Sequence, residues 1–129
     1  MSRTDTRPKV LCVDDDHDQR LLLSFLLERQ GVDVRTAYDG EVGVAIAQDW
    51  IPDLILMDLM MPGVDGFEAT KKLRADPRTS KIPILALTAY GEEKMQARAE
   101  AVGMDGFVLK TILPADLSDV LREYLPSLR

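Results

Sequence analysis

The stretch that decides the fold runs from Leu54 to Gly66 and reads LILMDLMMPGVDG. Four apolar residues in a row, Leu54 to Met57, are typical of a strand that is buried on both faces. The run ends at the carboxylate of Asp58, and the proline and glycines that follow indicate a turn. Such strands occur in parallel sheets that are covered by helices on both sides. The stretch therefore predicts an α/β protein with an acidic residue at the end of a central strand.

Four further short runs of apolar and β-branched residues accompany this one, and stretches with helical spacing lie between them. The strands that we expect are Val10–Val13, Asp33–Ala37, Leu54–Met57, Ile82–Leu87 and Gly106–Leu109. The second of these alternates polar and apolar residues, which is typical of an edge strand. Five strands that alternate with five helices predict a doubly wound α/β fold, a (βα)5 arrangement around a five-stranded parallel sheet in a single domain.

Cap and turn residues agree with this division. Asp65 is expected to cap the start of the third helix, and Thr88 or Gly91 the start of the fourth. Gly31 and Gly103 follow the first and fourth helices, where a glycine in the left-handed conformation commonly ends a helix. These residues place the connections between the predicted strands and helices.

The length and composition are those of one globular domain. The chain has 129 residues, of which 46% are hydrophobic and 29% charged. We expect a polar leader over residues 1–8, the domain over residues 9–125 and a short tail over residues 126–129. The single cysteine, Cys12, lies inside an apolar run and is expected to be a buried core thiol rather than a nucleophile.

The charge balance argues against several classes of function. The chain has 22 acidic and 16 basic residues and a formal net charge of -6, which disfavours direct binding to nucleic acid or to anionic membranes. No segment approaches the roughly 20 apolar residues that span a bilayer, and the first residues lack the hydrophobic core of a signal peptide. We therefore expect a cytoplasmic protein without membrane insertion.

Polar residues follow four of the five predicted strands. They are Asp14–Asp16 after the first strand, Asp58 after the third, Thr88 after the fourth and Lys110 after the fifth. Taken singly, they fit solvated loop residues, a helix cap and a surface lysine. Because ligands bind at the carboxyl ends of parallel strands, we expect these side chains to converge at one rim. Clustered carboxylates repel one another, so the cluster calls for a cation or a lysine.

The converging residues suit the transfer of a phosphoryl group to a carboxylate. Asp15 and Asp58 supply the oxygen ligands that Mg²⁺ prefers, and Asp14 would act through water. A carboxylate held on Mg²⁺ stays ionised and can attack phosphorus. The metal and Lys110 would neutralise charge on the transferred group, and Thr88 would donate a hydrogen bond to it. Since the set has no general base for water, we expect a phosphoryl acceptor and not an enzyme that hydrolyses phosphates.

At these positions the chain resembles bacterial response-regulator receiver domains, of which the chemotaxis regulator CheY is typical, from about Lys9 to Leu125. The matching motifs are Val13-Asp14-Asp15-Asp16, Asp58-Leu59-Met60-Met61-Pro62-Gly63-Val64-Asp65-Gly66, Leu87-Thr88-Ala89 and Lys110. The second motif is very specific, because the acceptor aspartate, Met-Pro-Gly and Asp-Gly occur at the family's spacing. The resemblance implies the flavodoxin-like, CheY-like version of the predicted fold.

The resemblance implies a role for each residue of the cluster. Asp58 is the implied phosphorylation site. Asp15 and the backbone carbonyl of Met60 are implied ligands of Mg²⁺, with Asp14 assisting through water. Lys110 is implied to pair with the acceptor or with its phosphoryl group. The implied donor is a histidine kinase or a histidine phosphotransfer protein.

The resemblance also implies a conformational switch. The hydroxyl of Thr88 moves toward the phosphoryl group and the ring of Phe107 turns inward, which changes the face of the fourth helix, fifth strand and fifth helix for a downstream protein partner. The chain stops at Arg129, so we expect a stand-alone receiver without an output domain. A receiver excised from a hybrid kinase, or an interaction module that works without phosphorylation, are the alternatives.

Several positions depart from the family's pattern. Thr111 follows Lys110 where the family usually has a proline after a cis bond; before a non-proline residue a cis bond costs about 2.5–4 kcal/mol, so we expect a trans bond. Phe107 replaces the more familiar tyrosine and lacks its hydroxyl. Met60 and Tyr90 occupy positions that tune the attack of water in this family. Neither is an acid or an amide that could orient water, so we expect a phosphorylated form that lasts minutes or more rather than seconds.

Two other classes share parts of the pattern. A phosphatase of the haloacid dehalogenase type also uses an aspartate nucleophile with Mg²⁺. It needs a second aspartate two residues later, where this chain has Met60. A flavin-binding domain of the flavodoxin type needs a hydroxyl-rich phosphate loop after the first strand, where this chain has three aspartates. The residues favour the receiver over both.

Overall fold

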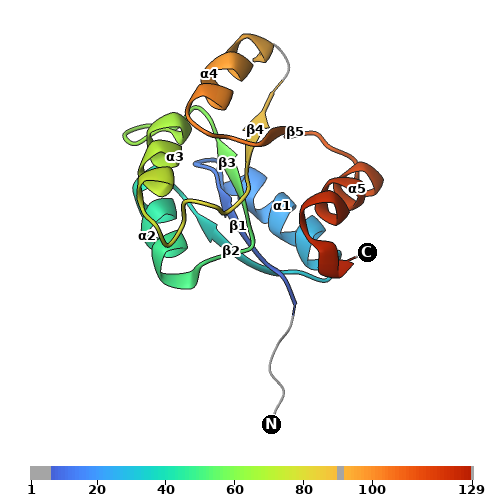
Figure 1. The fold of residues 1–129 in the computed structure, drawn as a ribbon. Helices are drawn as coiled ribbons and strands as arrows, with labels where there is room; N and C mark the ends of the chain where they lie inside the picture. Colours follow the sequence, from blue (N-terminus) through green and yellow to red (C-terminus); the bar gives the residue numbers. More distant parts are fainter. Residues whose placement is uncertain (1–6, 90–91, 129) are drawn as a thin grey trace.

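The fold is a parallel sheet between two layers of helices, as Figure 1 shows for the computed structural model, which describes residues 7–89 and 92–128. The strands are β1 (Lys9–Val13), β2 (Asp33–Ala37), β3 (Leu54–Asp58), β4 (Ile84–Thr88) and β5 (Gly106–Leu109). Their order in the sheet is β2-β1-β3-β4-β5, and every neighbouring pair is parallel. The doubly wound (βα)5 architecture expected from the sequence is confirmed.

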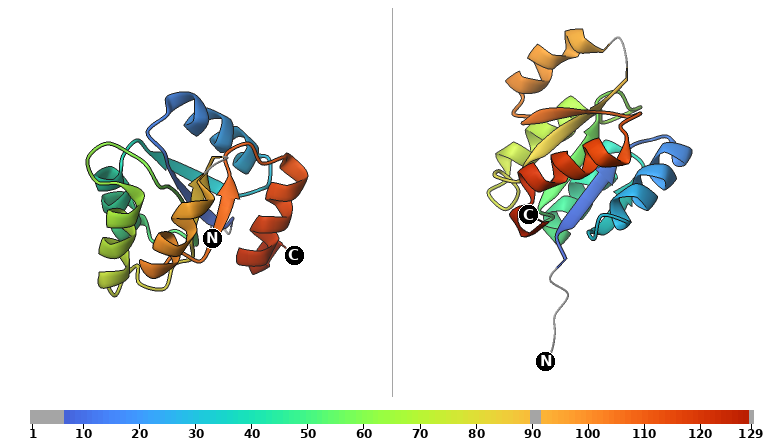
Figure 2. Two further views of the ribbon diagram at one scale, coloured as in Figure 1. Left: turned by 90° about the horizontal axis from the view of Figure 1, so that it is seen from above. Right: turned by 90° about the vertical axis from the view of Figure 1, so that its right-hand side faces the viewer.

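The helices cover both faces of the sheet. They are α1 (His17–Glu28), α2 (Gly40–Trp50), α3 (Gly66–Ala75), α4 (Gln96–Ala101) and α5 (Pro114–Tyr124), with 3₁₀ helices η1 (Glu93–Met95) and η2 (Pro126–Leu128). Figure 2 shows α1 and α5 on one side of the sheet, with α2 and α3 on the other. Within the described part of the chain, no helix is both long and apolar enough to cross a bilayer.

The central strands are buried on both faces because their successive side chains point to opposite sides. In β3, Ile55 and Met57 belong to the core shared with α2, α3 and α4. Leu54 and Leu56 belong to the second core, under α1 and α5. Each such side chain stabilises the fold by about 1.5–3 kcal/mol relative to an exposed one. The continuous apolar run of β3 therefore contributes side chains to both hydrophobic cores, and its polar residue, Asp58, stands at the end of the strand.

The strand β2 lies at the edge of the sheet, where its alternating sequence placed it. Its residues are mostly half-buried or exposed, and only Ala37 is buried. The guanidinium of Arg35 lies 4.6 Å from the ring centroid of Trp50, at the end of α2. A polar edge strand of this kind discourages pairing with a second sheet.

The fourth strand begins and ends later than predicted. We expected Ile82–Leu87, and the structure has Ile84–Thr88. The carbonyl of Ile82 accepts a hydrogen bond from Nη1 of Arg74 at 2.7 Å, and Pro83 has no N–H to donate to a ladder. The carbonyl of Ile82 is thus bound by a side chain, and Pro83 can contribute only its carbonyl, which accepts the N–H of Ile55 at 3.0 Å. The apolar character of these residues does not reveal either contact.

The start of the fourth helix was also predicted wrongly. Thr88 is the last residue of β4 and not a helix cap, while Gly91, the other candidate, lies outside the described residues. Helix α4 begins at Gln96, directly after η1, and has no side-chain cap. Asp65, in contrast, caps α3 as predicted.

Two glycines and one isoleucine take the left-handed conformation after helices. Gly31 and Gly103 have φ of 85° and 102°, as their positions after α1 and α4 predicted. Ile51 ends α2 with φ of 50°. No local pattern indicated this cap, because a β-branched residue rarely adopts a positive φ.

Candidate functional site

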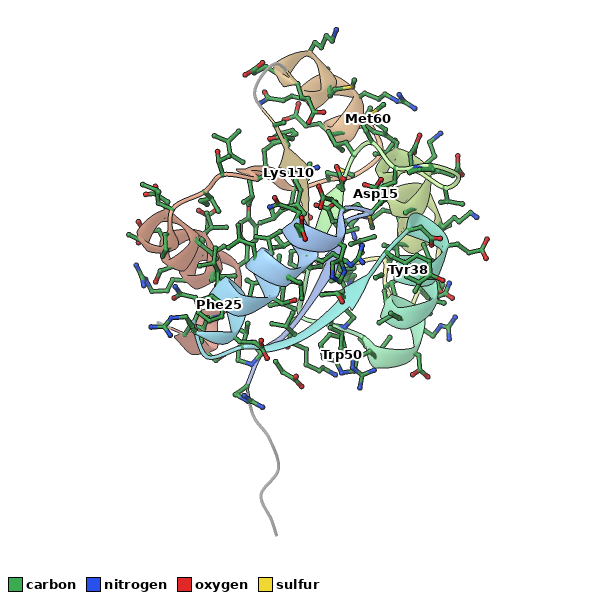
Figure 3. All side chains as sticks on the ribbon, turned by 180° about the vertical axis from the view of Figure 1, so that it is seen from behind. Asp15, Phe25, Tyr38, Trp50, Met60 and Lys110 are labelled. Atoms are coloured by element: carbon green, nitrogen blue, oxygen red, sulfur yellow. The ribbon has the colours of Figure 1, made fainter. Side chains whose placement is uncertain are left out.

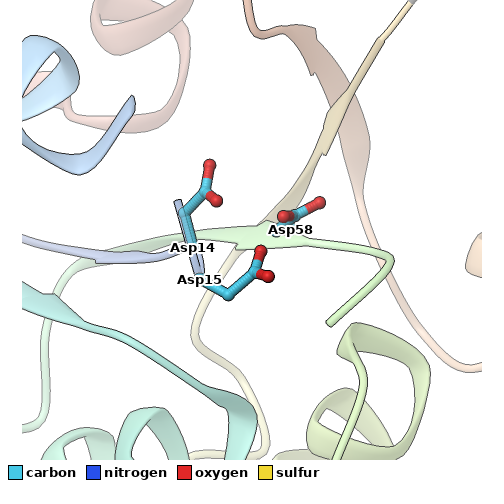
Figure 4. Close-up of side chains that lie close together, drawn as sticks. All are labelled: Asp14, Asp15 and Asp58. Carbon is cyan, nitrogen blue, oxygen red and sulfur yellow. The ribbon is translucent and has the colours of Figure 1, made fainter. Parts of the chain in front are cut away.

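The carboxyl ends of β1, β3 and β5 bring three carboxylates and a lysine together, as predicted. Figure 4 shows Asp14, Asp15 and Asp58 grouped at the ends of β1 and β3, and one carboxylate oxygen of each lies within 4.8 Å of the others. Lys110, labelled in Figure 3, reaches the same rim from the end of β5, where its Nζ contacts Asp58. The strand order reverses between β1 and β3, where open α/β sheets commonly bind their ligands.

Asp58 is a buried carboxylate in contact with a lysine. It ends β3 and is only 2% exposed. Nζ of Lys110 lies 3.0 Å from its Oδ2, and the N–H of Met60 donates weakly to Oδ1 at 3.4 Å. Burial, and after it the charge of Asp14, raise the pKa of Asp58 to about 7 against the lowering effect of Lys110. Its charged form therefore needs more positive charge than Lys110 alone provides.

Asp14 has a buried oxygen that no hydrogen bond satisfies. The residue is fully buried, and its Oδ1 accepts the N–H of Asp16 at 2.9 Å. Its Oδ2 has no hydrogen-bond partner within the described residues. Nζ of Lys110 lies 3.8 Å from this oxygen, which is beyond hydrogen-bond distance. A buried carboxylate oxygen without a partner is costly and calls for a water or an ion.

The donor set fits Mg²⁺. It consists of carboxylate oxygens, with the exposed Asp15 on the solvent side, where waters can complete an octahedral shell. The unsatisfied oxygen of Asp14 suits a water bound to the metal. Met60, whose carbonyl is the further predicted ligand, stands in the loop after Asp58 and is exposed. Ligation by Asp15, Asp58 and Met60 stays a prediction.

The backbone fixes Lys110 at the rim. Its N–H donates to the carbonyl of Thr88 at 2.8 Å, and its own carbonyl accepts from Nε2 of Gln19, on α1, at 3.0 Å. No cis peptide bond occurs in residues 7–89 and 92–128, so the bond to Thr111 is trans, as expected. The lysine therefore reaches Asp58 without the family's usual cis-proline turn.

The two predicted switch residues share one cavity. Thr88 ends β4 and is buried, while Phe107 lies on β5 and is half-buried. Both line a cavity of about 230 Å³ together with residues of the turn that leads to α4. There is space next to Phe107 in which its ring can turn. The movement itself stays a prediction.

Two further residues shape the site, and the sequence assigned a structural role to neither of them. Arg20, on α1, donates from Nη1 to the carbonyl of Asp14 at 2.7 Å and so holds the acidic loop. Gly66 begins α3 so close to the acceptor that a Cβ there would lie 2.1 Å from the carbonyl oxygen of Asp58. The Asp-Gly motif marked Gly66, but its contact depends on how α3 packs. No sequence signal marked Arg20.

Two other side chains can be placed, and one predicted residue cannot. Cys12 is buried, and burial, more than nearby charge, raises its pKa to about 12, which supports a core thiol rather than a nucleophile. His17 is exposed at the start of α1, with its Nδ1 3.4 Å from Nη2 of Arg20. Tyr90, predicted to influence dephosphorylation, lies outside the described residues.

Fold and site together define a receiver of two-component signalling. The family model described as response regulator receiver domain matches residues 10–122, and the chain therefore belongs to this family. Among solved structures, the chemotaxis protein CheY4 of Vibrio cholerae superposes with a TM-score of 0.87 at 35% identity. That match covers 93% of this chain and all of CheY4. A second match is the receiver domain of the sensor histidine kinase PA1611 from Pseudomonas aeruginosa, with a TM-score of 0.86 at 28% identity. That structure has a magnesium ion in its active-site cleft. This match covers 94% of this chain and 99% of that domain.

The relatives include both short and long proteins. RpaA of Synechocystis, a DNA-binding transcriptional regulator, is 41% identical over 95% of this chain and 49% of its own length. PilH of Pseudomonas aeruginosa is 36% identical over 81% of this chain and 86% of its own length. The chain thus spans about half the length of RpaA and of the phosphate regulon regulator PhoB from Rhizobium meliloti.

Proposed function

We propose that this chain is a phosphorylatable receiver whose Asp58 accepts a phosphoryl group in a Mg²⁺-dependent reaction. The observation that carries the proposal is the buried Asp58 carboxylate, held 3.0 Å from Nζ of Lys110 beside the unsatisfied Oδ2 of Asp14. A nucleophile, a fixed cation and an incomplete set of metal ligands are the parts that phosphoryl transfer to a carboxylate needs.

The transfer would take place between a phosphohistidine and Asp58. An oxygen of Asp58 forms the bond to phosphorus while the bond from phosphorus to the donor nitrogen breaks, and that nitrogen keeps the electron pair. Lys110 stays charged and neutralises the phosphoryl oxygens. Mg²⁺, when held by Asp15, Asp58 and the Met60 carbonyl with Asp14 acting through water, keeps the nucleophile ionised and lowers the repulsion between it and the incoming group.

The donor that we propose is a histidine kinase or a histidine phosphotransfer protein. Leu21, Leu22 and Phe25 are exposed on α1, and Figure 3 shows Phe25 on the outer side of this helix. Gln19, on the same helix, contacts the Lys110 loop. An apolar strip beside an acceptor supports docking of a protein rather than of a small phosphate alone.

The output that we propose is a change on the face made of α4, β5 and α5. Thr88 would turn toward the phosphoryl group, and Phe107 would follow into the cavity between them. Leu109 and Leu113 are exposed on this face, next to a cavity of about 420 Å³. A downstream protein would read this surface, either as the target of a single-domain regulator or within a larger chain. GacS of Pseudomonas syringae, a sensor protein that is 38% identical over 91% of this chain, illustrates the second arrangement.

We further propose that the protein is not a hydrolytic enzyme, and that it loses the phosphoryl group slowly. Position 60, two residues after the acceptor, is a methionine where a dehalogenase-type phosphatase needs an acid, so that side chain cannot act as a general base for water. The partial exposure of the Met60 side chain places a bulky thioether in the loop beside the acceptor.

Incubation with acetyl phosphate and Mg²⁺ tests the proposal. We expect the intact mass of the wild type to rise by one phosphoryl group, and no rise without Mg²⁺ or in Asp58→Asn. Asp49→Asn, at an exposed residue of α2, makes the same charge change and should be phosphorylated like the wild type. An unchanged wild-type mass, or equal gains in Asp58→Asn and wild type, would contradict the proposal.

The lifetime of the phosphorylated form is a separate prediction. After removal of acetyl phosphate, we expect the added mass to decay over minutes or more. Met60→Asn places an amide that can orient water and should shorten the lifetime, because the methionine can neither donate nor accept a strong hydrogen bond. A wild-type half-life of a few seconds, measured by quenched-flow mass spectrometry, would show that the prediction is wrong.

A further inference from the structure

The turn after β4 is held by a glutamate side chain. Oε1 of Glu92 accepts the N–H of Ala89 at 2.8 Å, and the N–H of Glu92 donates to the carbonyl of Ala89 at 3.2 Å. Ala89 directly follows Thr88, whose carbonyl accepts the N–H of Lys110. A carboxylate is thus bound to the first amide beyond the predicted switch threonine.

The carboxylate of Glu92 is also part of the charge around the site. Glu92 lines the same cavity as Thr88 and Phe107. Burial lowers the pKa of Lys110, but the surrounding carboxylates, Asp58 first and Glu92 among them, raise it above its usual value. Lys110 therefore lies within the field of Glu92 as well as that of Asp58.

We propose that Glu92 is an autoinhibitory latch, whose carboxylate occupies the amide of Ala89 in the unphosphorylated protein and leaves it when Asp58 carries a phosphoryl group. This inference rests on the function proposed for Asp58. A phosphoryl group brings about two negative charges and three strong acceptor oxygens to the rim. These charges repel Glu92, and the oxygens compete for the amide that it holds.

Release of Glu92 would carry the signal toward α4. The carbonyl of Glu92 accepts the N–H of Met95 at 2.9 Å, and Glu92 is the N-cap of η1, which continues into α4. Within the described residues, α4 buries only Ala99, so little packing opposes a shift of its beginning. The latch would thereby join phosphorylation to the face that we propose for the output.

A simple helix cap makes the opposite prediction. The contact from Glu92 to Ala89 has the spacing of one half of a capping box, in which a glutamate reaches back three residues to a backbone N–H. If it served only as a cap, its loss would loosen the turn and leave phosphorylation unchanged or weaker. If it is a latch, its loss makes phosphorylation more favourable. The two interpretations therefore predict opposite effects of losing the contact on how readily Asp58 is phosphorylated.

The test compares Glu92→Gln, which removes the charge but keeps an acceptor oxygen, and Glu92→Ala, which removes both, with Glu93→Gln, the same charge change at the exposed next residue. The acetyl phosphate concentration that half-phosphorylates each protein at fixed Mg²⁺ is measured by intact mass, and the Ala89 amide is followed by ¹⁵N NMR. For Glu92→Gln we expect a half-saturating concentration about threefold to tenfold below that of the wild type. We also expect a shifted Ala89 amide resonance in Glu92→Ala. Glu93→Gln should change neither by a comparable amount.

Each outcome decides between the proposals. If the wild type is phosphorylated and both Glu92 variants need the wild-type concentration, the latch is wrong and the receiver function stands. If the Ala89 resonance is the same in wild type and in Glu92→Ala, which removes the acceptor oxygen altogether, the contact does not exist in solution and the latch is wrong. If the wild type gains no phosphoryl group, both proposals fail together.

Discussion

Asp58→Asn is expected to raise the free energy of unfolding by about 1–3 kcal/mol at pH 8 in the presence of a metal chelator. The Asp58 carboxylate is buried next to Asp14, and burial and this neighbouring charge raise its pKa to about 7. In the unfolded chain the group has a pKa near 3.9. The folded state therefore holds a proton that the unfolded state has released, and stability falls as the pH rises from about 4 to about 7. Asparagine removes the repelled charge and keeps the size of the side chain.

Urea unfolding as a function of pH measures this effect. The free energy of unfolding of Asp58→Asn should exceed that of the wild type most above pH 7. This difference should shrink toward pH 4, where Asp58 becomes protonated in the unfolded as well as in the folded state. Asp49→Asn, the exposed control, should show no such pH-dependent gain. Addition of Mg²⁺ should reduce the extra stability of Asp58→Asn, because the cation stabilises the ionised carboxylates of the wild type. A variant less stable than wild type at pH 8 would contradict this electrostatic account.

Arg74→Ala is expected to lower the free energy of unfolding by about 2–4 kcal/mol. The guanidinium of Arg74, on α3, donates to the carbonyls of Gly103, Ser80 and Ile82 and to Oδ2 of Asp105. It thereby ties α3 to the starts of β4 and β5. Truncation of Arg74 would leave these part-buried acceptors without a hydrogen-bond donor, and each lost hydrogen bond lowers the free energy of unfolding.

Arg78 provides a matched control for Arg74. It also pairs with an aspartate, Asp76, but its side chain is 61% exposed, against 21% for Arg74. Arg78→Ala should change the urea midpoint little, because an exposed ion pair is weakened by solvent. Arg74→Lys should recover only part of the loss, since an ammonium cannot reproduce the planar fork of donors. Equal losses in Arg74→Ala and Arg78→Ala would contradict the account.

The parts of the fold that follow from local sequence were predictable. Apolar runs such as Leu54–Met57 placed β3, and the parallel sheet then placed Asp14, Asp58 and Lys110 at one rim without any motif. The edge position of β2 followed from its alternation. These inferences succeed because burial acts on each strand directly, and because the ends of parallel strands meet at one edge.

The errors arose where tertiary contacts override local preference. Arg74, on α3, donates a hydrogen bond to the carbonyl of Ile82, two residues before the start of β4. This contact joins two elements that are separate in the sequence. The beginning of α4 depends on the turn that Glu92 holds, and Thr88 pairs in β4 instead of capping the helix. The contact of Arg20 with the acidic loop comes from the packing of α1. No local pattern in the sequence reports such contacts.

The measurement that tests the central claim most directly is the location of the acyl phosphate in the phosphorylated wild type. Borohydride reduces an aspartyl phosphate to homoserine, and peptide mass spectrometry then identifies the modified position. We predict homoserine at position 58, with Asp14 and Asp15 unmodified, because Asp58 is the carboxylate that Lys110 contacts at 3.0 Å. Homoserine at position 14 or 15 and not at 58, or no homoserine in a protein that has gained a phosphoryl group, would contradict the assignment of Asp58 as the acceptor.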